Sequence, residues 1–290
     1  MTGIGGGSLM TPLLILVFGI QPTTAIGTDL AYGAVTKTVG GYRHFRQRTV
    51  DLPLSLWMAV GSVPAAVAGV FALDAIEDAA GADFDNVVLT ILAGALFICG
   101  FATLARVFIK SLDARERDHV PLERRHKIAA VLLGLGVGFV LGMTSVGSGA
   151  LIAVGLILVF RLIPNKVVGT DVFHAGILLW AAAIAHTIAG NVDFGLAGNI
   201  LIGSVPGVWV GSRWSVRVPA GALRPALALL LIGAGLALLA KADVVAVPTA
   251  VLAAFPVVVG LLFGASVLWR RRTTAARSAR SLAAPAGPRA

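Results

Sequence analysis

The sequence predicts an all-α, polytopic membrane protein of about 8–10 transmembrane segments, built from two inverted repeats with glycine-broken helical hairpins. The first observation behind this prediction is composition. The 290 residues are 57% apolar and 13% charged, whereas soluble domains carry about 25% charged residues. The apolar residues form runs of roughly 18 or more, which is the length that crosses a bilayer as a helix. A soluble globular fold is therefore excluded.

The second observation is an internal repeat at an offset of 142 residues, measured from Asp29 to Asp171. The alignment of the two copies needs no gap. Its identical stretches include Leu14–Phe18 with Leu156–Phe160, and Gly27-Thr28-Asp29 with Gly169-Thr170-Asp171. So long a match indicates a duplication, which is a recurrent plan of secondary transporters.

Taken in chain order, the apolar segments give ten candidate spans. Two of these spans are short, and each of the two follows a glycine-rich break. The candidates are 8–20, 24–42, 53–73, 87–109, 128–145, 149–162, 166–188, 194–212, 225–241 and 244–269.

The third observation is the position of the basic residues, which decides whether 128–162 is one long helix or a hairpin. If it is a hairpin, all of the 23 Lys and Arg residues except Lys37 and Lys241 lie in segments that face one side. The acidic segment 74–85 then lies on the other side. Because cytoplasmic loops are enriched in Lys and Arg, we predict a hairpin and assign the basic side to the cytoplasm.

The hairpin gives each repeat an odd number of crossings, so the second copy is expected to insert upside down relative to the first. The second copy begins with an apolar run that has no counterpart before Met1; either this leading helix is missing from the first copy, or the true start lies upstream. The predicted organisation is a first repeat (1–109), a cytoplasmic linker (110–127), a second repeat (128–241), an additional C-terminal transmembrane helix (242–269) and a disordered basic cytoplasmic tail (270–290).

The net charge of +9 does not indicate a nucleic-acid partner, because the basic loops and tail show no aromatic interleaving. The tail arginines are expected to fix topology and to contact anionic lipid headgroups. Cys99, the single cysteine, is expected to be a buried core thiol.

The glycine breaks provide the first candidate substrate-binding residues: Gly5, Gly6 and Gly7 in the first copy, and Gly147, Ser148 and Gly149 in the second. Glycines interrupt a helix, and irregular backbone at membrane depth survives only inside protein or next to a wet cavity. The freed N–H groups and the following helix N-terminus favour an anion. The alternative is close helix packing, which we expect for Gly134, Gly136, Gly138 and Gly142.

The two Gly-Thr-Asp steps provide the next candidates. Each Asp lies about 10 Å into its helix, and inverted insertion would bring Asp29 and Asp171 together near the midplane. Carboxylates inside a membrane usually mark ion or proton pathways, so both are candidates for proton coupling. Thr28 and Thr170 are expected to add hydroxyl donors for the substrate. The alternative for both aspartates is helix capping, which is the better interpretation for a second pair, Asp51 and Asp193.

Lys37 is the one cation that is not close to the end of a predicted span, and it could contact an anionic substrate or form an internal ion pair. His174 lies one turn after Asp171, so the two could share a proton. The repeat-equivalent His44 and His186 are expected to pack near span ends. No metal-ligand spacing, catalytic constellation or cofactor motif is found, so neither an enzyme nor a bound cofactor is predicted.

At these residues the chain resembles the TauE/SafE family of sulfite exporters and related anion permeases. The resemblance covers both halves, roughly residues 1–240, and it rests on GIGGGSLMTPLL, the P-x-x-x-x-G-T-[DS] step, the basic RHFRQRTVD loop, and G-S-V-P with Gly69 and Gly211. It implies a multi-pass permease of the bacterial inner membrane, with a small sulfur-containing anion such as sulfite or an organosulfonate as substrate and an ion gradient as driving force. The first copy departs from the family in carrying Asp29 where Ser is frequent.

The sequence therefore predicts a secondary transporter with alternating access and a cytoplasmic C-terminus. Its expected partners are a small anionic substrate and the lipid bilayer; association with further copies of the chain is left open. An anion channel, or a permease for a non-sulfur organic anion, is the alternative.

Overall fold

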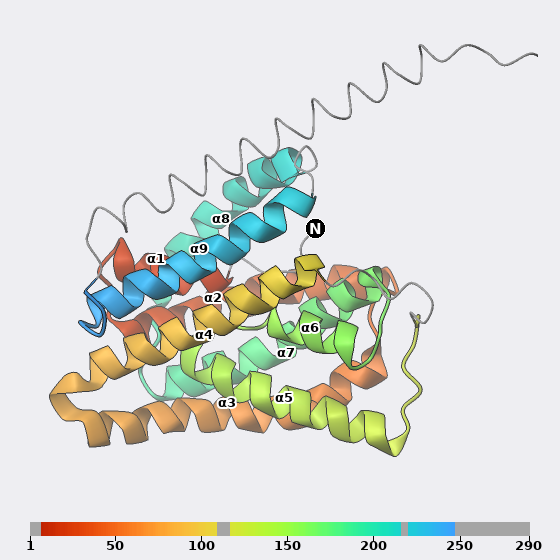
Figure 1. Cartoon of the computed structure of the whole chain (residues 1–290), viewed down its shortest axis with the longest axis horizontal. Coiled ribbons are helices and arrows are strands. Elements are labelled where there is room, and N and C mark those ends of the chain that lie inside the picture. The colour runs from red at the N-terminus through yellow and green to blue at the C-terminus, as the bar shows by residue number, and fades with distance from the viewer. Residues whose placement is uncertain (1–6, 109–116, 216–219, 247–290) are drawn as a thin grey trace, which may run out of the picture.

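The computed structural model describes residues 7–108, 117–215 and 220–246 (Figure 1). These residues form nine α-helices and one short 3-10 helix, and nine of the predicted spans each coincide with an α-helix. The tenth predicted span, 244–269, and the basic tail fall almost wholly outside the described residues. In chain order the helices are α1 (Gly7–Leu16), α2 (Pro22–Arg46), α3 (Leu52–Ala80), η1 (Gly81–Asp83), α4 (Phe84–Phe108), α5 (Arg124–Thr144), α6 (Leu151–Leu158), α7 (Pro164–Ile188), α8 (Phe194–Ser215) and α9 (Ala220–Lys241).

Local chemistry explains several helix ends. Prolines open α2 and α7, where a missing N–H and a fixed φ are compatible with the first helical position. The Asp51 side chain accepts a hydrogen bond from the N–H of Leu54 (3.2 Å), and Asp193 accepts one from Leu196 (2.9 Å). The prediction that this aspartate pair caps helices is therefore confirmed.

A hairpin rather than one long helix follows the linker. Helix α5 ends at Ser145, a non-glycine residue with φ of 59°, and Gly147 has φ of 123°. After α6, the chain returns to the linker: Arg117 donates its N–H to the carbonyl of Arg161 (2.8 Å) and accepts a bond from Ile163 (3.0 Å). The predicted glycine-broken hairpin is thus present.

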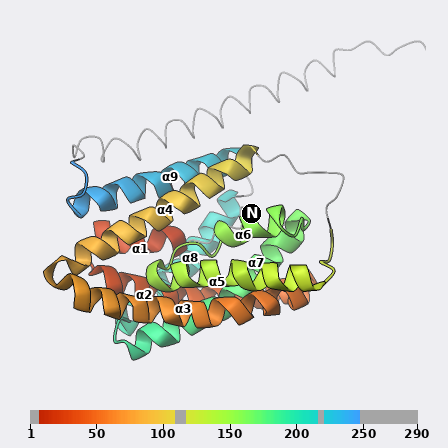
Figure 2. The same ribbon diagram turned by 60° about the horizontal axis from the view of Figure 1, so that its bottom comes forward.

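Equivalent helices of the two copies pack against each other in antiparallel pairs. Gly27, early in α2, lies against Asn191 just beyond α7, whereas Gly41, late in α2, lies against Phe173 early in α7. The pair α4 and α9 runs side by side in the same manner (Figure 2). Two equivalent helices that run in opposite directions are what an inverted pair of repeats requires.

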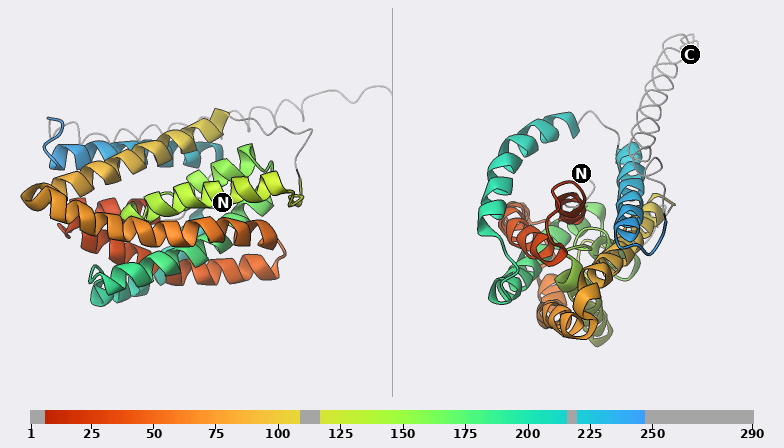
Figure 3. Two further views of the ribbon diagram at one scale, coloured as in Figure 1. Left: turned by 90° about the horizontal axis from the view of Figure 1, so that it is seen from below. Right: turned by 90° about the vertical axis from the view of Figure 1, so that its left-hand side faces the viewer.

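Helix α3 packs along α5, and the two run parallel through a small-residue contact (Figure 3). A Cβ at Gly134 would collide with the carbonyl of Met58, and one at Gly138 with the carbonyl of Ser62; Gly142 is equally close to α3. Backbones this close explain why glycine is needed here. The packing prediction is confirmed for these three glycines and wrong for Gly136, which has no described atom within 4 Å.

The described residues contain three apolar helical stretches that are long enough to cross a membrane. They are Leu52–Ala105, which Gly81–Asp83 divides into α3 and α4, together with Arg124–Thr144 and Pro164–Ile188. One buried apolar cluster joins α2, α3, α5, α6 and α7, and a second joins α1, α4 and α9. The second cluster includes Cys99, which is buried and free, as predicted.

Candidate functional site

Asp29, in α2, is a buried acid whose hydrogen-bond partners are defined. Its side chain is fully buried. Its Oδ2 accepts two hydrogen bonds, from Thr11 Oγ1 (2.7 Å) and Ser145 Oγ (2.8 Å). Its Oδ1 is buried and has no hydrogen bond among the described residues. The carboxyl therefore joins both copies of the repeat, since Thr11 belongs to the first and Ser145 to the second.

Three different elements position these groups. Thr11 lies on the short helix α1, four residues after Gly7. Ser145 takes the left-handed conformation that ends α5, which turns its hydroxyl toward α2. Helix α2 begins at Pro22, with Gln21 as its N-cap, so Asp29 lies well inside the helix. The alternative that Asp29 caps the helix N-terminus is therefore wrong.

The surroundings of Asp29 decide what its carboxyl can do. An ionised carboxylate has about four lone-pair sites, and the hydroxyls of Thr11 and Ser145 satisfy only part of this capacity. A charged acid within a membrane costs at least about 2.5–3.5 kcal/mol unless it is compensated. The site can therefore gain stability by taking up a proton or a cation at Asp29; a coupling role for this residue stays a prediction.

The glycine break of the second copy directly follows Ser145. Gly147, Ser148 and Gly149 are buried between α5 and α6, and a Cβ at Gly147 would lie 3.2 Å from Leu151. In the first copy, Gly7 is the first residue of α1, while Gly5 and Gly6 lie outside the described residues. The break 147–149 is thus placed next to the Asp29 carboxyl through Ser145; its contact with a substrate remains a prediction.

Asp171 is also fully buried, in α7. The two carboxyls do not converge as the sequence suggested. Because α2 and α7 are antiparallel, Asp171 lies close to the Gly41–Phe173 contact near the end of α2, about 18 Å from the level of Asp29 at 1.5 Å per residue. The two aspartates occupy opposite ends of the paired helices.

Thr28 and Thr170 make reciprocal contacts between the copies. Thr28 Oγ1 accepts a hydrogen bond from the N–H of Asp193 (3.0 Å), and Thr170 Oγ1 accepts one from the N–H of Asp51 (2.9 Å). Each threonine thus fastens its helix to the capped start of a helix in the other copy. The structure gives these hydroxyls a structural role, and substrate contact by them stays a prediction.

Lys37 and His174 are not brought to Asp29. Lys37 is half-buried on α2, about 12 Å further along the helix at 1.5 Å per residue, and no ion pair of its ammonium is found among the described residues. Both ring nitrogens of His174 lie 3.2 Å from groups on α3, the hydroxyl of Ser62 and the carbonyl of Ser55. These contacts fasten α7 to α3.

The two repeat-equivalent histidines, both near helix ends, each lie beside the residue at an equivalent position, although His186 is fully buried and His44 only partly. His44 Nδ1 lies 2.9 Å from the Thr49 hydroxyl, and His186 Nδ1 lies 3.5 Å from the Asn191 amide. In addition, His186 Nε2 lies 2.8 Å from the carbonyl of Gly142. The expectation that both histidines pack near span ends is consistent with these contacts.

Sequence reasoning missed Thr11, Ser145 and a buried lysine, Lys166. Thr11 and Ser145 are hydroxyls within apolar runs beside the two glycine breaks, which is a signal that could have drawn attention to them. Lys166 was counted only as a loop cation, yet just 5% of its surface is exposed. Nothing in its local sequence distinguishes it, because its neighbours Arg48 and Asp118 come from distant segments.

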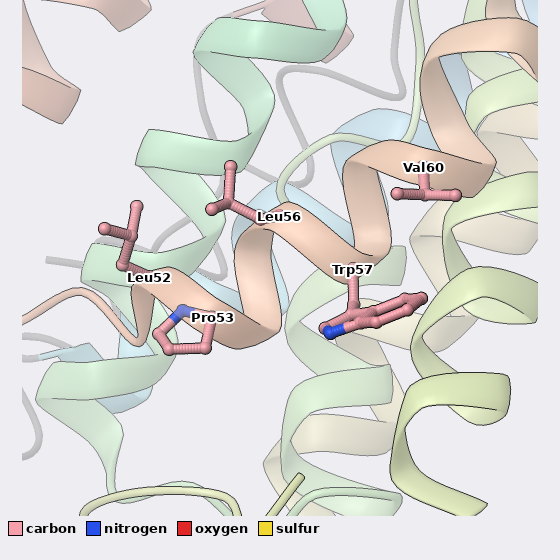
Figure 4. A pocket seen from close by; sticks show the side chains of 5 residues that line it. All are labelled: Leu52, Pro53, Leu56, Trp57 and Val60. Carbon is pink, nitrogen blue, oxygen red and sulfur yellow. The ribbon is translucent and has the colours of Figure 1, made fainter. Parts of the chain in front are cut away.

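Two other features of the described residues concern metal binding and a surface hollow. Within the described residues no group of three or more His, Cys, Asp or Glu side chains is arranged to hold a metal ion. Figure 4 shows a hollow at the start of α3 that is lined by apolar side chains, including Leu56, Trp57 and Val60. Lys127 lies over the Trp57 ring at 5.1 Å. The apolar lining of this hollow suits a lipid chain better than an anion.

Comparison with known proteins agrees with this architecture. The profile of the family described as "Sulfite exporter TauE/SafE" matches residues 1–238. Two Bacillus subtilis (strain 168) proteins are similar over 82% of this chain and 93% of their own length: "Probable membrane transporter protein YjnA", at 37% identity, and "Probable membrane transporter protein YdhB", at 30%. A third, "Probable membrane transporter protein YunE", is 22% identical over 75% of this chain and 82% of its own.

No solved structure matches the chain significantly. The match to the family profile extends over both repeats, from the first glycine break to the end of α9. Together with the long apolar helices, it identifies a multi-pass membrane transporter. The chain belongs to the TauE/SafE family.

Proposed function

We propose that the protein is a proton-coupled secondary transporter for a small sulfur-containing anion, such as sulfite or an organosulfonate. This proposal rests on the buried Asp29 carboxyl, which accepts hydrogen bonds from hydroxyl groups of both copies of the repeat. Because this carboxyl is hydrogen-bonded to both copies, its surroundings would change when one copy moves relative to the other. The substrate class is proposed from the description of the family.

Alternating access would arise from movement of one copy against the other. The antiparallel packing of α2 with α7, and of α4 with α9, supports opposite insertion of the two copies. Movement that separates Ser145 from Asp29 would expose the carboxyl, while the break 147–149 would offer N–H groups to the anion. A proton on Asp29 would reduce the repulsion that an anion meets there.

In this proposal the protein lies in the bacterial inner membrane. The basic loop 43–48, the linker and the C-terminus face the cytoplasm, because these segments carry most of the Lys and Arg residues. The partners are a small anion and the surrounding lipid. No cofactor and no catalytic step are needed, because a proton gradient supplies the driving force.

The test is flux in proteoliposomes that contain the purified full chain. Sulfite, methanesulfonate and taurine would be compared with acetate and chloride, with and without a proton gradient. We expect saturable sulfite or sulfonate flux that a proton gradient accelerates. Equal flux of carboxylates would reassign the substrate, and non-saturating single-channel currents would reassign the protein as a channel. Sulfur-anion flux that is indifferent to the gradient would contradict the coupling.

A further inference from the structure

A buried cation lies at the end of the molecule that carries the basic loops. Lys166, the third residue of α7, has a side chain that is 7% exposed. Its ammonium donates one hydrogen bond, to the carbonyl of Arg48 (3.0 Å). The nearest carboxylate, that of Asp118, is 4.0 Å away, beyond hydrogen-bond distance. Because an ammonium has three donors, Lys166 keeps capacity for a further acceptor within the described surroundings.

Beside Lys166 lies a short piece of the linker, residues 117–120, which we call the strap. One anchor of the strap is the backbone pairing of Arg117 with Arg161 and Ile163. Its other anchor is the N–H of Val120, which donates to Asp51 Oδ2 (3.0 Å). Between the anchors, Asp118 and His119 are both well exposed.

The Asp118 carboxylate therefore lies beside a buried cation without forming a hydrogen bond to it. Its other neighbour is His119, at 3.4 Å from Oδ2, and His119 in turn lies 3.7 Å from Asp51. Since 63% of the Asp118 side chain is exposed, it can rotate into solvent while both anchors stay in place. An exposed carboxylate at this distance contributes little attraction, so a free anion can compete with it.

The opposite end of the molecule has no such arrangement among the described residues. The position equivalent to Lys166 in the first copy is Thr24, and the equivalent of the buried Asp51 is the exposed Asp193. Within the described part of the chain, the buried cation is thus found at one end, although the two copies are related by sequence.

We propose that Lys166 is a second anion-binding site at the cytoplasmic end of the transporter, and that Asp118 occupies it as a tethered substitute for the anion. This inference rests on the proposed function for the identity of the anion, but not for the existence of the site. The ligand class is a small oxyanion such as sulfite or sulfate. The arriving anion displaces the Asp118 side chain, which rotates into solvent while both anchors of the strap stay in place.

The first experiment measures binding rather than transport. The full chain, purified in detergent, is titrated with sulfite, sulfate and methanesulfonate while its thermal stability is followed. The Asp118→Asn variant removes the competing charge, and we expect half-maximal stabilisation at a concentration about 3- to 10-fold lower. In Lys166→Gln we expect that concentration to rise at least about 10-fold, because the charged donor is lost.

Matched controls are Asp85→Asn, an exposed aspartate at the start of α4, and Lys127→Gln, a lysine at the start of α5. Both should behave as wild type. In the double variant of Lys166 and Asp118, the effect of Asp118→Asn should vanish. Unchanged or weaker anion affinity in Asp118→Asn overturns the proposal, as does Lys166→Gln with lowered stability but unchanged affinity.

The binding titration also separates this inference from the proposed function. Lys166-dependent binding without sulfite flux in proteoliposomes would leave the anion site in place and contradict the transport assignment. Sulfite flux with no Lys166-dependent binding of any of the three anions would support the transport assignment and contradict the anion site at Lys166.

Discussion

Asp29 and Asp171 occupy equivalent positions in α2 and α7, yet their surroundings differ. The Asp29 carboxyl accepts hydrogen bonds from the hydroxyl groups of Thr11 and Ser145. At the position equivalent to Thr11, the second copy has the buried Ala153, which cannot donate a hydrogen bond. The duplication therefore supplied two buried acids whose equivalent neighbours differ at this position.

The same divergence is seen in α3 and α8. Helix α3 is covered by α5, and Gly61 lies against the carbonyl of Val131. The equivalent residue in α8, Gly203, has no described atom within 4 Å, and α8 lies at the edge of the bundle (Figure 3). One copy thus has a tightly packed glycine contact where the equivalent glycine of the other meets no described atom, so paired substitutions can measure what each environment contributes.

The largest difference in stability is expected for this glycine pair. Gly61→Ala places a methyl group against backbone of α5 that cannot move aside, so we expect destabilisation of about 3 kcal/mol, at the upper end for overpacking. Gly203→Ala should be neutral or stabilising by about 0.5–1 kcal/mol, since alanine favours the helix. Thermal unfolding of the two variants in detergent provides the measurement. Equal effects would contradict the packing of α3 on α5.

A smaller difference is expected for the two capping aspartates. Asp193→Ala removes one cap, which costs about 1 kcal/mol. Asp51→Ala also leaves the N–H of Val120 without its acceptor, so its cost should be about 1–3 kcal/mol greater. Denaturation midpoints would be compared with that of wild type. If Asp193→Ala is the more damaging variant, the strap does not depend on Asp51.

The smallest effect is expected at Thr11. Thr11→Val keeps the shape of the side chain but removes a hydrogen bond to a carboxyl, worth about 1.5 kcal/mol, so transport should fall roughly 10-fold. Thr11→Ser retains the hydroxyl and should transport nearly as wild type. Initial rates in proteoliposomes, normalised to the amount of folded protein, give the comparison. A fully active Thr11→Val variant would show that this hydroxyl does not position Asp29.

Much of the fold could be predicted because it depends on local and periodic signals. Apolar runs located the helices, Asp51 and Asp193 capped as expected, and the basic loops predicted the hairpin of α5 and α6. The register of α2 against α7 could not be predicted, because an internal repeat fixes which residues are equivalent but not how far the helices overlap. The expected meeting of Asp29 with Asp171 failed for this reason.

The candidate site was predicted in part. Asp29 and the break 147–149 were identified from residue type and spacing, but the bond from Ser145 depends on a left-handed residue at the end of α5. The contacts of Lys166 are with Arg48 and Asp118, which lie far from it in the sequence. Such contacts between distant segments leave no periodic signal in the sequence.

We propose that Asp29, rather than Asp171, takes up the coupling proton. The most direct measurement compares Asp29→Asn with Asp171→Asn in proteoliposomes, following both accumulation of sulfite driven by a proton gradient and exchange of sulfite at equilibrium. We predict that Asp29→Asn loses gradient-driven accumulation while keeping exchange, and that Asp171→Asn keeps both at a reduced rate. Gradient-driven accumulation by Asp29→Asn at the wild-type level would contradict the account.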